Sequence, residues 1–74
     1  MNELVKQLYG EDWGKASERV KELVRTEQEA ESLVNELILV RGWRERVTAA
    51  KITTAYQLKA LVPRLVATFR EGPE

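Results

Sequence analysis

The stretch that decides the fold is ASERVKELVRTEQEAESLVNELILVR, residues 16–41. It contains neither Pro nor Gly, and its apolar residues recur every three or four positions, which is the periodicity of an amphipathic helix. We therefore expect one long helix over 16–41. Its middle, Arg25 to Glu29, lacks apolar residues, so this part is expected to project from the core or to meet a polar partner. Gly42 fits the position after a helix end, where a positive φ costs little; the alternative is a helix that continues through Gly42.

Shorter helices are expected on both sides of this stretch. Apolar residues at helical spacing predict a short helix over 1–10, a second short helix over 43–50, and a last helix over 54–70. The chain is therefore predicted to be one all-α domain, compact, with three or four helices in a short-long-short order around one long central helix.

The expected start of the last helix rests on Ile52, Thr53 and Thr54. An apolar residue just before a threonine N-cap is the arrangement that fixes the angle at which a chain enters a helix. Pro63 lacks a backbone donor and clashes with the preceding turn of a helix, so we expect a kink or a restart there.

Length and composition limit the kind of protein. A domain of 74 residues buries only about 60% of the surface of its unfolded chain. The absence of Cys and His excludes disulfides and the thiolate or imidazole ligands of zinc, haem and iron-sulfur sites, so oligomerisation or partner binding is the remaining source of stability. No apolar run is long enough for a membrane span and no leader pattern is visible, which predicts an intracellular protein, cytoplasmic or nuclear/nucleoid.

The charges are balanced overall but divided along the chain. Residues 1–40 carry five positive and nine negative side chains, a net of −4, and residues 41–74 carry seven and three, a net of +4. A net charge of zero argues against coating nucleic acid by bulk electrostatics. The division indicates either an interaction polarity or two halves that attract each other within the fold.

Catalytic and metal chemistry find little support in the residue types. Glu27 and Glu31 stand one helical turn apart and offer oxygens that suit Mg²⁺, but no second cluster supplies the remaining ligands. Serine and threonine nucleophiles need an adjacent base and a third orienting group, and no His is present to serve. We expect no catalytic residue, no metal, no cofactor and no small-molecule substrate, and hence no enzyme.

Two groups of residues are candidates for binding. The first is a basic patch, predicted to point outward around an aromatic ring that could stack on a base: Arg41, Trp43, Arg44, Arg46 and Lys51. The alternative is that the cations offset a helix dipole while Trp43 packs inward. The second is a set of apolar residues expected to form the core or an interface for a partner helix: Leu33, Val34, Leu37, Ile38, Val40, Leu58, Leu61, Leu65 and Phe69.

The segment 57–69, QLKALVPRLVATF, resembles the last helix of centromere protein X, a small histone-fold subunit with a similar Gln-Leu, Pro and Phe pattern. Arg41 and Gly42 would lie near the end of that family's long central helix, and residues 52–54 resemble the loop before its third helix. The resemblance implies an obligate histone-fold heterodimer bound to DNA. The polar stretch 25–31 and the neutral net charge depart from that pattern.

The sequence thus predicts a non-catalytic helical subunit for protein-protein interaction or assembly, which binds itself or another helical protein. The alternatives are a nucleic-acid-associated module that uses residues 41–51, and a viral or engineered helical assembly protein.

Overall fold

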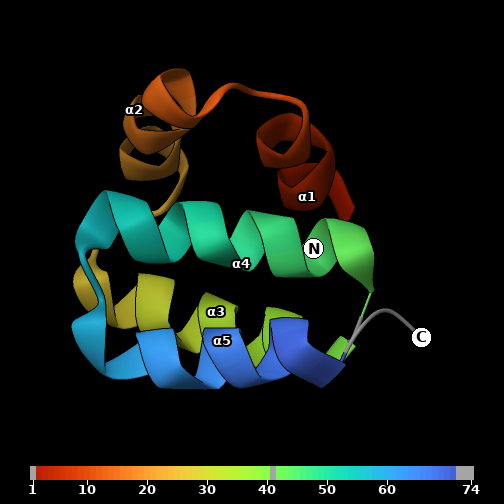
Figure 1. Ribbon diagram of the computed structural model, residues 1–74. Helices are drawn as coiled ribbons and strands as arrows, with labels where there is room; N and C mark the ends of the chain where they lie inside the picture. The colour runs from red at the N-terminus through yellow and green to blue at the C-terminus, as the bar shows by residue number, and fades with distance from the viewer. Residues whose placement is uncertain (1, 41, 72–74) are drawn as a thin grey trace.

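Helices make up nearly all of the computed structural model, which describes residues 2–40 and 42–71 (Figure 1). Within those residues the elements are α1 (Asn2–Tyr9), α2 (Trp13–Leu23), α3 (Glu27–Val40), α4 (Trp43–Tyr56), the 3-10 turn η1 (Lys59–Leu61) and α5 (Val62–Glu71), with no strand. The all-α class is confirmed. The predicted short-long-short order of three or four helices is not, because the longest helices are two of 14 residues each.

The helix predicted over 16–41 is in fact two helices, α2 and α3. Val24 leaves the helical conformation at φ −118° and ψ 110° and is buried. Thr26 Oγ1 then accepts a hydrogen bond from the backbone N–H of Glu29 at 3.1 Å, and Glu29 Oε2 accepts one from the N–H of Arg25 at 3.4 Å. This exchange is a variant of the capping box that starts helices at Thr-x-x-Glu. The polar middle of the stretch is therefore a helix junction.

The boundary between the helices predicted over 43–50 and 54–70 lies further along the chain than predicted. Residues 52–54 lie inside α4, so they are not the start of a helix. The chain turns at Gln57, which adopts the left-handed conformation at φ 53° and ψ 49°. The N–H of Leu58 donates to the carbonyl of Thr53 at 3.0 Å and the N–H of Gln57 to that of Thr54 at 3.3 Å. This pair of bonds is a Schellman motif, and the burial of Leu58 fixes the turn.

Gly42 and Pro63 both lie at helix starts. Gly42 is the N-cap of α4 with φ −84° and ψ 151°, so the predicted positive φ is wrong, and no helix continues through it. Pro63 is the second residue of α5, in the first turn, where a helix needs no backbone donor. Where a kink or a restart was predicted, α5 begins at Val62, directly after the 3-10 turn η1.

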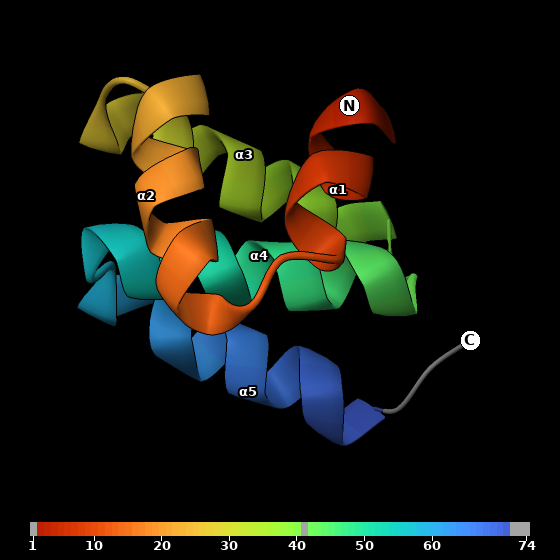
Figure 2. The same ribbon diagram turned by 90° about the horizontal axis from the view of Figure 1, so that it is seen from above.

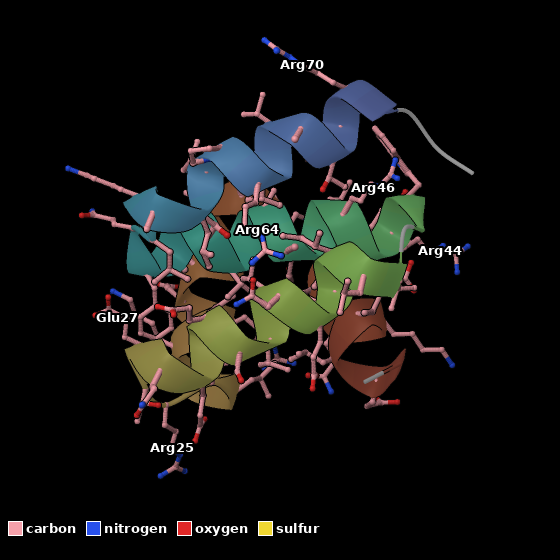
Figure 3. The ribbon with its side chains drawn as sticks, turned by 90° about the horizontal axis from the view of Figure 1, so that it is seen from below. Arg25, Glu27, Arg44, Arg46, Arg64 and Arg70 are labelled. Carbon is pink, nitrogen blue, oxygen red and sulfur yellow. The ribbon has the colours of Figure 1, made fainter. Side chains whose placement is uncertain are left out.

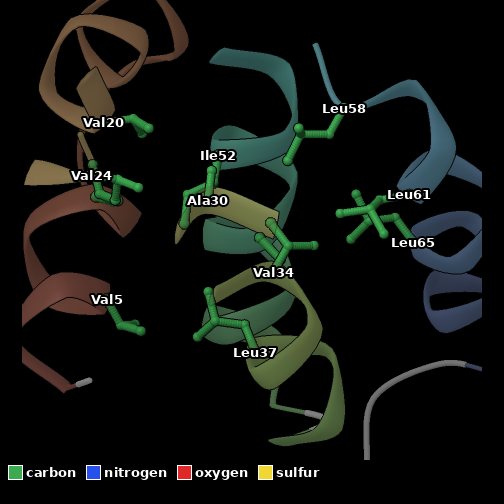
Figure 4. Packing of buried hydrophobic residues seen from close by; sticks show 12 residues of the cluster. Val5, Val20, Val24, Ala30, Val34, Leu37, Ile52, Leu58, Leu61 and Leu65 are labelled. Carbon is green, nitrogen blue, oxygen red and sulfur yellow. The ribbon is translucent and has the colours of Figure 1, made fainter. Parts of the chain in front are cut away.

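Helix α4 lies at the centre and contacts each of the other four helices. Figures 1 and 2 show α1 and α2 together on one side of it, with α3 and α5 below on opposite flanks. The hydrophobic cluster joins all five helices, and Figure 4 shows Leu61 and Leu65 directed toward Val34. Of the predicted apolar set, Val34, Leu37, Leu58, Leu61 and Leu65 are buried, Leu33, Ile38 and Phe69 are half-buried, and Val40 is exposed.

The central helix is unusually polar for its position. Arg46, Thr48, Lys51 and Thr53 are all buried. The Thr48 hydroxyl donates to the carbonyl of Arg44 at 2.8 Å. The Thr53 hydroxyl has no hydrogen-bond partner among the residues placed in the structure, and a buried polar atom without a partner costs free energy.

The conformation of Gln57 predicts a stabilising substitution. Gln57→Gly should raise the free energy of unfolding by about 1 kcal/mol, because glycine adopts a left-handed conformation without the penalty of a Cβ. Chemical denaturation measures the change. Gln28→Gly, in the first turn of α3, is the matched control and should destabilise. Equal effects of the two substitutions would contradict the assigned turn.

The two buried threonines of α4 predict opposite responses to one substitution. Thr53→Val keeps the shape and removes an unpaired hydroxyl, so it should stabilise the protein by about 1 kcal/mol. Thr48→Val removes a hydroxyl that has a partner, and should gain nothing or destabilise. Thermal melts of both variants compare the effects, and a Thr53→Val variant less stable than Thr48→Val would refute the interpretation.

Candidate interaction surface

The structure separates the four described residues of the predicted basic patch. Arg41 lies outside the described residues, whereas Trp43 and Arg44 are exposed at the start of α4. Arg46 is 0% exposed and Lys51 is 4% exposed, so the outward placement predicted for both is wrong. Figure 3 shows Arg46 between α4 and α5 and Arg44 directed away from the fold. The continuous basic patch is not assembled.

Lys51 is buried because it closes the end of α1. Its Nζ donates to the carbonyls of Leu8 and Tyr9, each at 2.8 Å, and to that of Glu11 at 2.5 Å. Three ammonium hydrogens thus meet three carbonyls that α1 and its turn leave without helical partners. The ring of Trp13 lies 5.6 Å from Nζ, within the range of a cation–π contact. The charge is therefore used inside the fold.

A shallow pocket of about 410 Å³ lies where the end of α1 meets the start of α4. At the edge of this pocket, the Arg44 guanidinium lies 5.8 Å from the centre of the Tyr9 ring. The lining residues are Val5, Lys6, Tyr9, Gly10, Arg44 and Glu45. The pocket therefore offers a bound molecule both charged groups and apolar surface.

The acidic residues considered for metal binding lie at the start of α3. Glu29 already accepts the N–H of Arg25. In the part of the chain that the structure places, no three acidic side chains are grouped so that they could hold a metal ion. Over the same residues, no helix has the length and apolar character to cross a membrane.

One face of α4 is left open by its neighbours. Trp43, Val47, Ala50 and Thr54 follow helical spacing along this face; Trp43 is 51% exposed, and Val47 and Ala50 are half-buried. In Figure 1 this helix runs across the front of the molecule, between α1 and α2 above and α5 below. This face of α4 is therefore only partly covered by the neighbouring helices.

Helix α5 extends this face with further apolar side chains. The Phe69 ring meets Trp43 edge-on, with centroids 5.6 Å apart at 85°. On the other flank of α5, Arg64 Nη1 donates to Asn35 Oδ1 of α3 at 2.5 Å. Helical spacing places Val62 and Val66, 45% and 43% exposed, on the flank away from α3. We call Trp43, Val47, Ala50, Val62, Val66 and Phe69 the Trp43 surface.

Sequence reasoning included Trp43 and Phe69 but missed the valines of this surface. The predicted core or interface set contains Leu61 and Leu65 but neither Val62 nor Val66. With α5 beginning at Val62, Leu61 and Leu65 face the core, whereas Val62 and Val66 are exposed. One sequence signal distinguishes the exposed valines from the buried leucines. Lys59 and Arg70 follow the same stripe as Val62 and Val66, and charged residues on a stripe indicate a solvent-facing side.

Comparisons with known proteins returned no match among family models, curated proteins or solved structures. The resemblance of 57–69 to a histone-fold helix, and the nucleic-acid and viral or engineered alternatives, therefore stay predictions.

The contacts of Lys51 predict a large loss of stability when its charge is removed. Lys51→Met keeps the apolar stem but leaves three carbonyls without their donor, so the free energy of unfolding should fall by about 3 kcal/mol. Denaturant titration followed by circular dichroism measures it. Lys59→Met, on the exposed η1 turn, should change it by less than about 0.5 kcal/mol. Similar losses in the two variants would show that Lys51 does not hold α1.

Proposed function

We propose that this protein is a non-catalytic helical subunit that works by binding other protein chains through the Trp43 surface. The observation that supports it is the half-exposed Trp43, which lies in contact with Phe69 beside two exposed valines. Tryptophan is enriched among the residues that dominate binding energies. Contiguous apolar side chains on a small protein, bordered by polar ones, are typical of protein interfaces.

Two further features support a binding role. The hydrophobic interior is small, and its central helix contains four buried polar residues. The apolar surface left exposed is therefore a large part of what could contribute to the free energy of unfolding if it were covered. Leu39 and Val40, at the end of α3, are 74% and 56% exposed, which adds apolar surface close in sequence to Trp43. Covering these side chains with a partner would remove them from water and stabilise both chains.

The proposal predicts that a complex is lost when the Trp43 surface is made polar. The tagged chain, expressed in its own cells, should be recovered after cross-linking in a complex heavier than its own 8.5 kDa. Trp43→Ser combined with Val66→Ser should reduce that complex by more than about tenfold, since each hot-spot residue contributes about 2 kcal/mol. Native mass spectrometry measures the yield.

The matched control is Leu23→Ser, which makes an exposed apolar residue of α2 polar outside the Trp43 surface. It should leave the complex intact. Thermal melts must show that both variants fold. Recovery of the unaltered chain only as the free 8.5 kDa species would overturn the proposal.

A further inference from the structure

Opposite charges are concentrated on two helices of this chain. The segment 27–40, which is α3, contains four glutamates and no Lys or Arg, while residues 59–70 contain Lys59, Arg64 and Arg70 and no Asp or Glu. Figure 2 shows α3 on one side of α4 and α5 on the other. We call the flank of α4 that carries α3 the acidic side and the flank that carries α5 the basic side; Arg64 of α5 reaches Asn35 of α3 where the two helices meet.

The basic side combines charge with apolar contact. Lys59, Val62, Val66 and Arg70 follow one another at three or four residues, and all four are exposed. Figure 3 shows Arg70 directed away from the fold, on the edge opposite α3. We call these four residues the α5 stripe; its two valines belong to the Trp43 surface.

The acidic side also has a stripe of exposed residues. Glu29, Ser32, Glu36 and Val40 are spaced by three, four and four residues, and all are exposed, with the 74% exposed Leu39 beside them. We call Glu29, Ser32, Glu36 and Val40 the α3 stripe. The α3 stripe covers 11 residue steps within one α-helix, about 16 Å. The α5 stripe begins on the 3-10 turn η1, and its α-helical part runs from Val62 to Arg70, so the two stripes can lie along each other over that part.

We infer that the partner of the Trp43 surface is a second copy of this chain, whose α3 stripe packs along the α5 stripe. This inference rests on the proposed function and identifies its partner. The charges of the two stripes are opposite, and each stripe brings at least one exposed apolar side chain. Within a chain the stripes face apart, so one copy cannot satisfy both. The contact is therefore head-to-tail, a heterologous interface that continues from copy to copy or closes into a ring.

The expected strength is modest. Two helices of 10 and 14 residues bury less surface than the roughly 800 Å² per partner of a standard interface. A dissociation constant between about 10 µM and 1 mM is expected for one contact. Because the exposed charges are screened by salt, association should weaken as ionic strength rises.

Charge reversal tests the inference. Sedimentation velocity should show concentration-dependent association of the unaltered chain. Lys59→Glu with Arg70→Glu makes both stripes acidic, and Ser32→Lys with Glu36→Lys makes both basic, so each double variant alone should be monomeric. An equimolar mixture should associate again, because an acidic α5 stripe then meets a basic α3 stripe. Glu29 stays unchanged because it caps the start of α3.

The control is Lys6→Glu with Lys15→Glu on α1 and α2, which changes the net charge by the same amount as Lys59→Glu with Arg70→Glu; it should associate like the unaltered chain. A monomer at all concentrations up to about 1 mM, or association that the reversals leave intact, would overturn the inference. So would a mixture that stays monomeric. If the chain is monomeric but still forms a complex that Trp43→Ser with Val66→Ser abolishes, the proposed function stands and only the second copy is wrong.

Discussion

The bond between the Lys51 ammonium and the last carbonyls of α1 is the interaction on which the rest of the structure depends. A buried charge is costly unless its hydrogens are satisfied, and here each of the three meets a carbonyl. At the last residue of α4, the Tyr56 hydroxyl donates to the carbonyl of Val24, where α2 ends. One helix thus terminates two others, and this fixes α1 and α2 across its upper side.

The open face follows from this use of the central helix. Two sides of α4 carry α3 and α5, and a third carries the ends of α1 and α2. No described helix remains for the side that bears Trp43, and a chain of this length cannot cover every face of a central helix. The polar residues that would usually mark a solvent face, such as Lys51 and Thr53, point inward instead, and apolar residues are left outside.

The sequence predicted the helical class, the end of a helix near residue 41, a kink or a restart at Pro63 and most of the buried leucines, because these depend on local periodicity and backbone chemistry. It failed at the junction 24–26, although Thr26 and Glu29 carry a recognisable capping pattern; the absence of Pro and Gly and the helical apolar spacing on both sides of the junction outweighed that pattern. It also failed for Lys51 and for the αL turn at Gln57. The carbonyls that bind Lys51 lie about 40 positions away in the chain, and glutamine gives no local sign of a left-handed conformation. Contacts of that range decide which cations are buried.

The division of charge along the chain left two readings open, attraction within the fold and an interaction polarity. Arg64, from the positive half, donates to the neutral amide of Asn35 although α3 is rich in glutamates, and the ion pair Arg19–Glu22 lies within one helix. Exposed charges such as Lys59, Arg70 and Glu36 thus remain on the surface. Such charges contribute orientation more than affinity. Lys51 binds the carbonyls of α1, so part of the positive half acts within the fold. For the exposed remainder, burial of the valines would supply the free energy of association, and the charges would select which two faces meet.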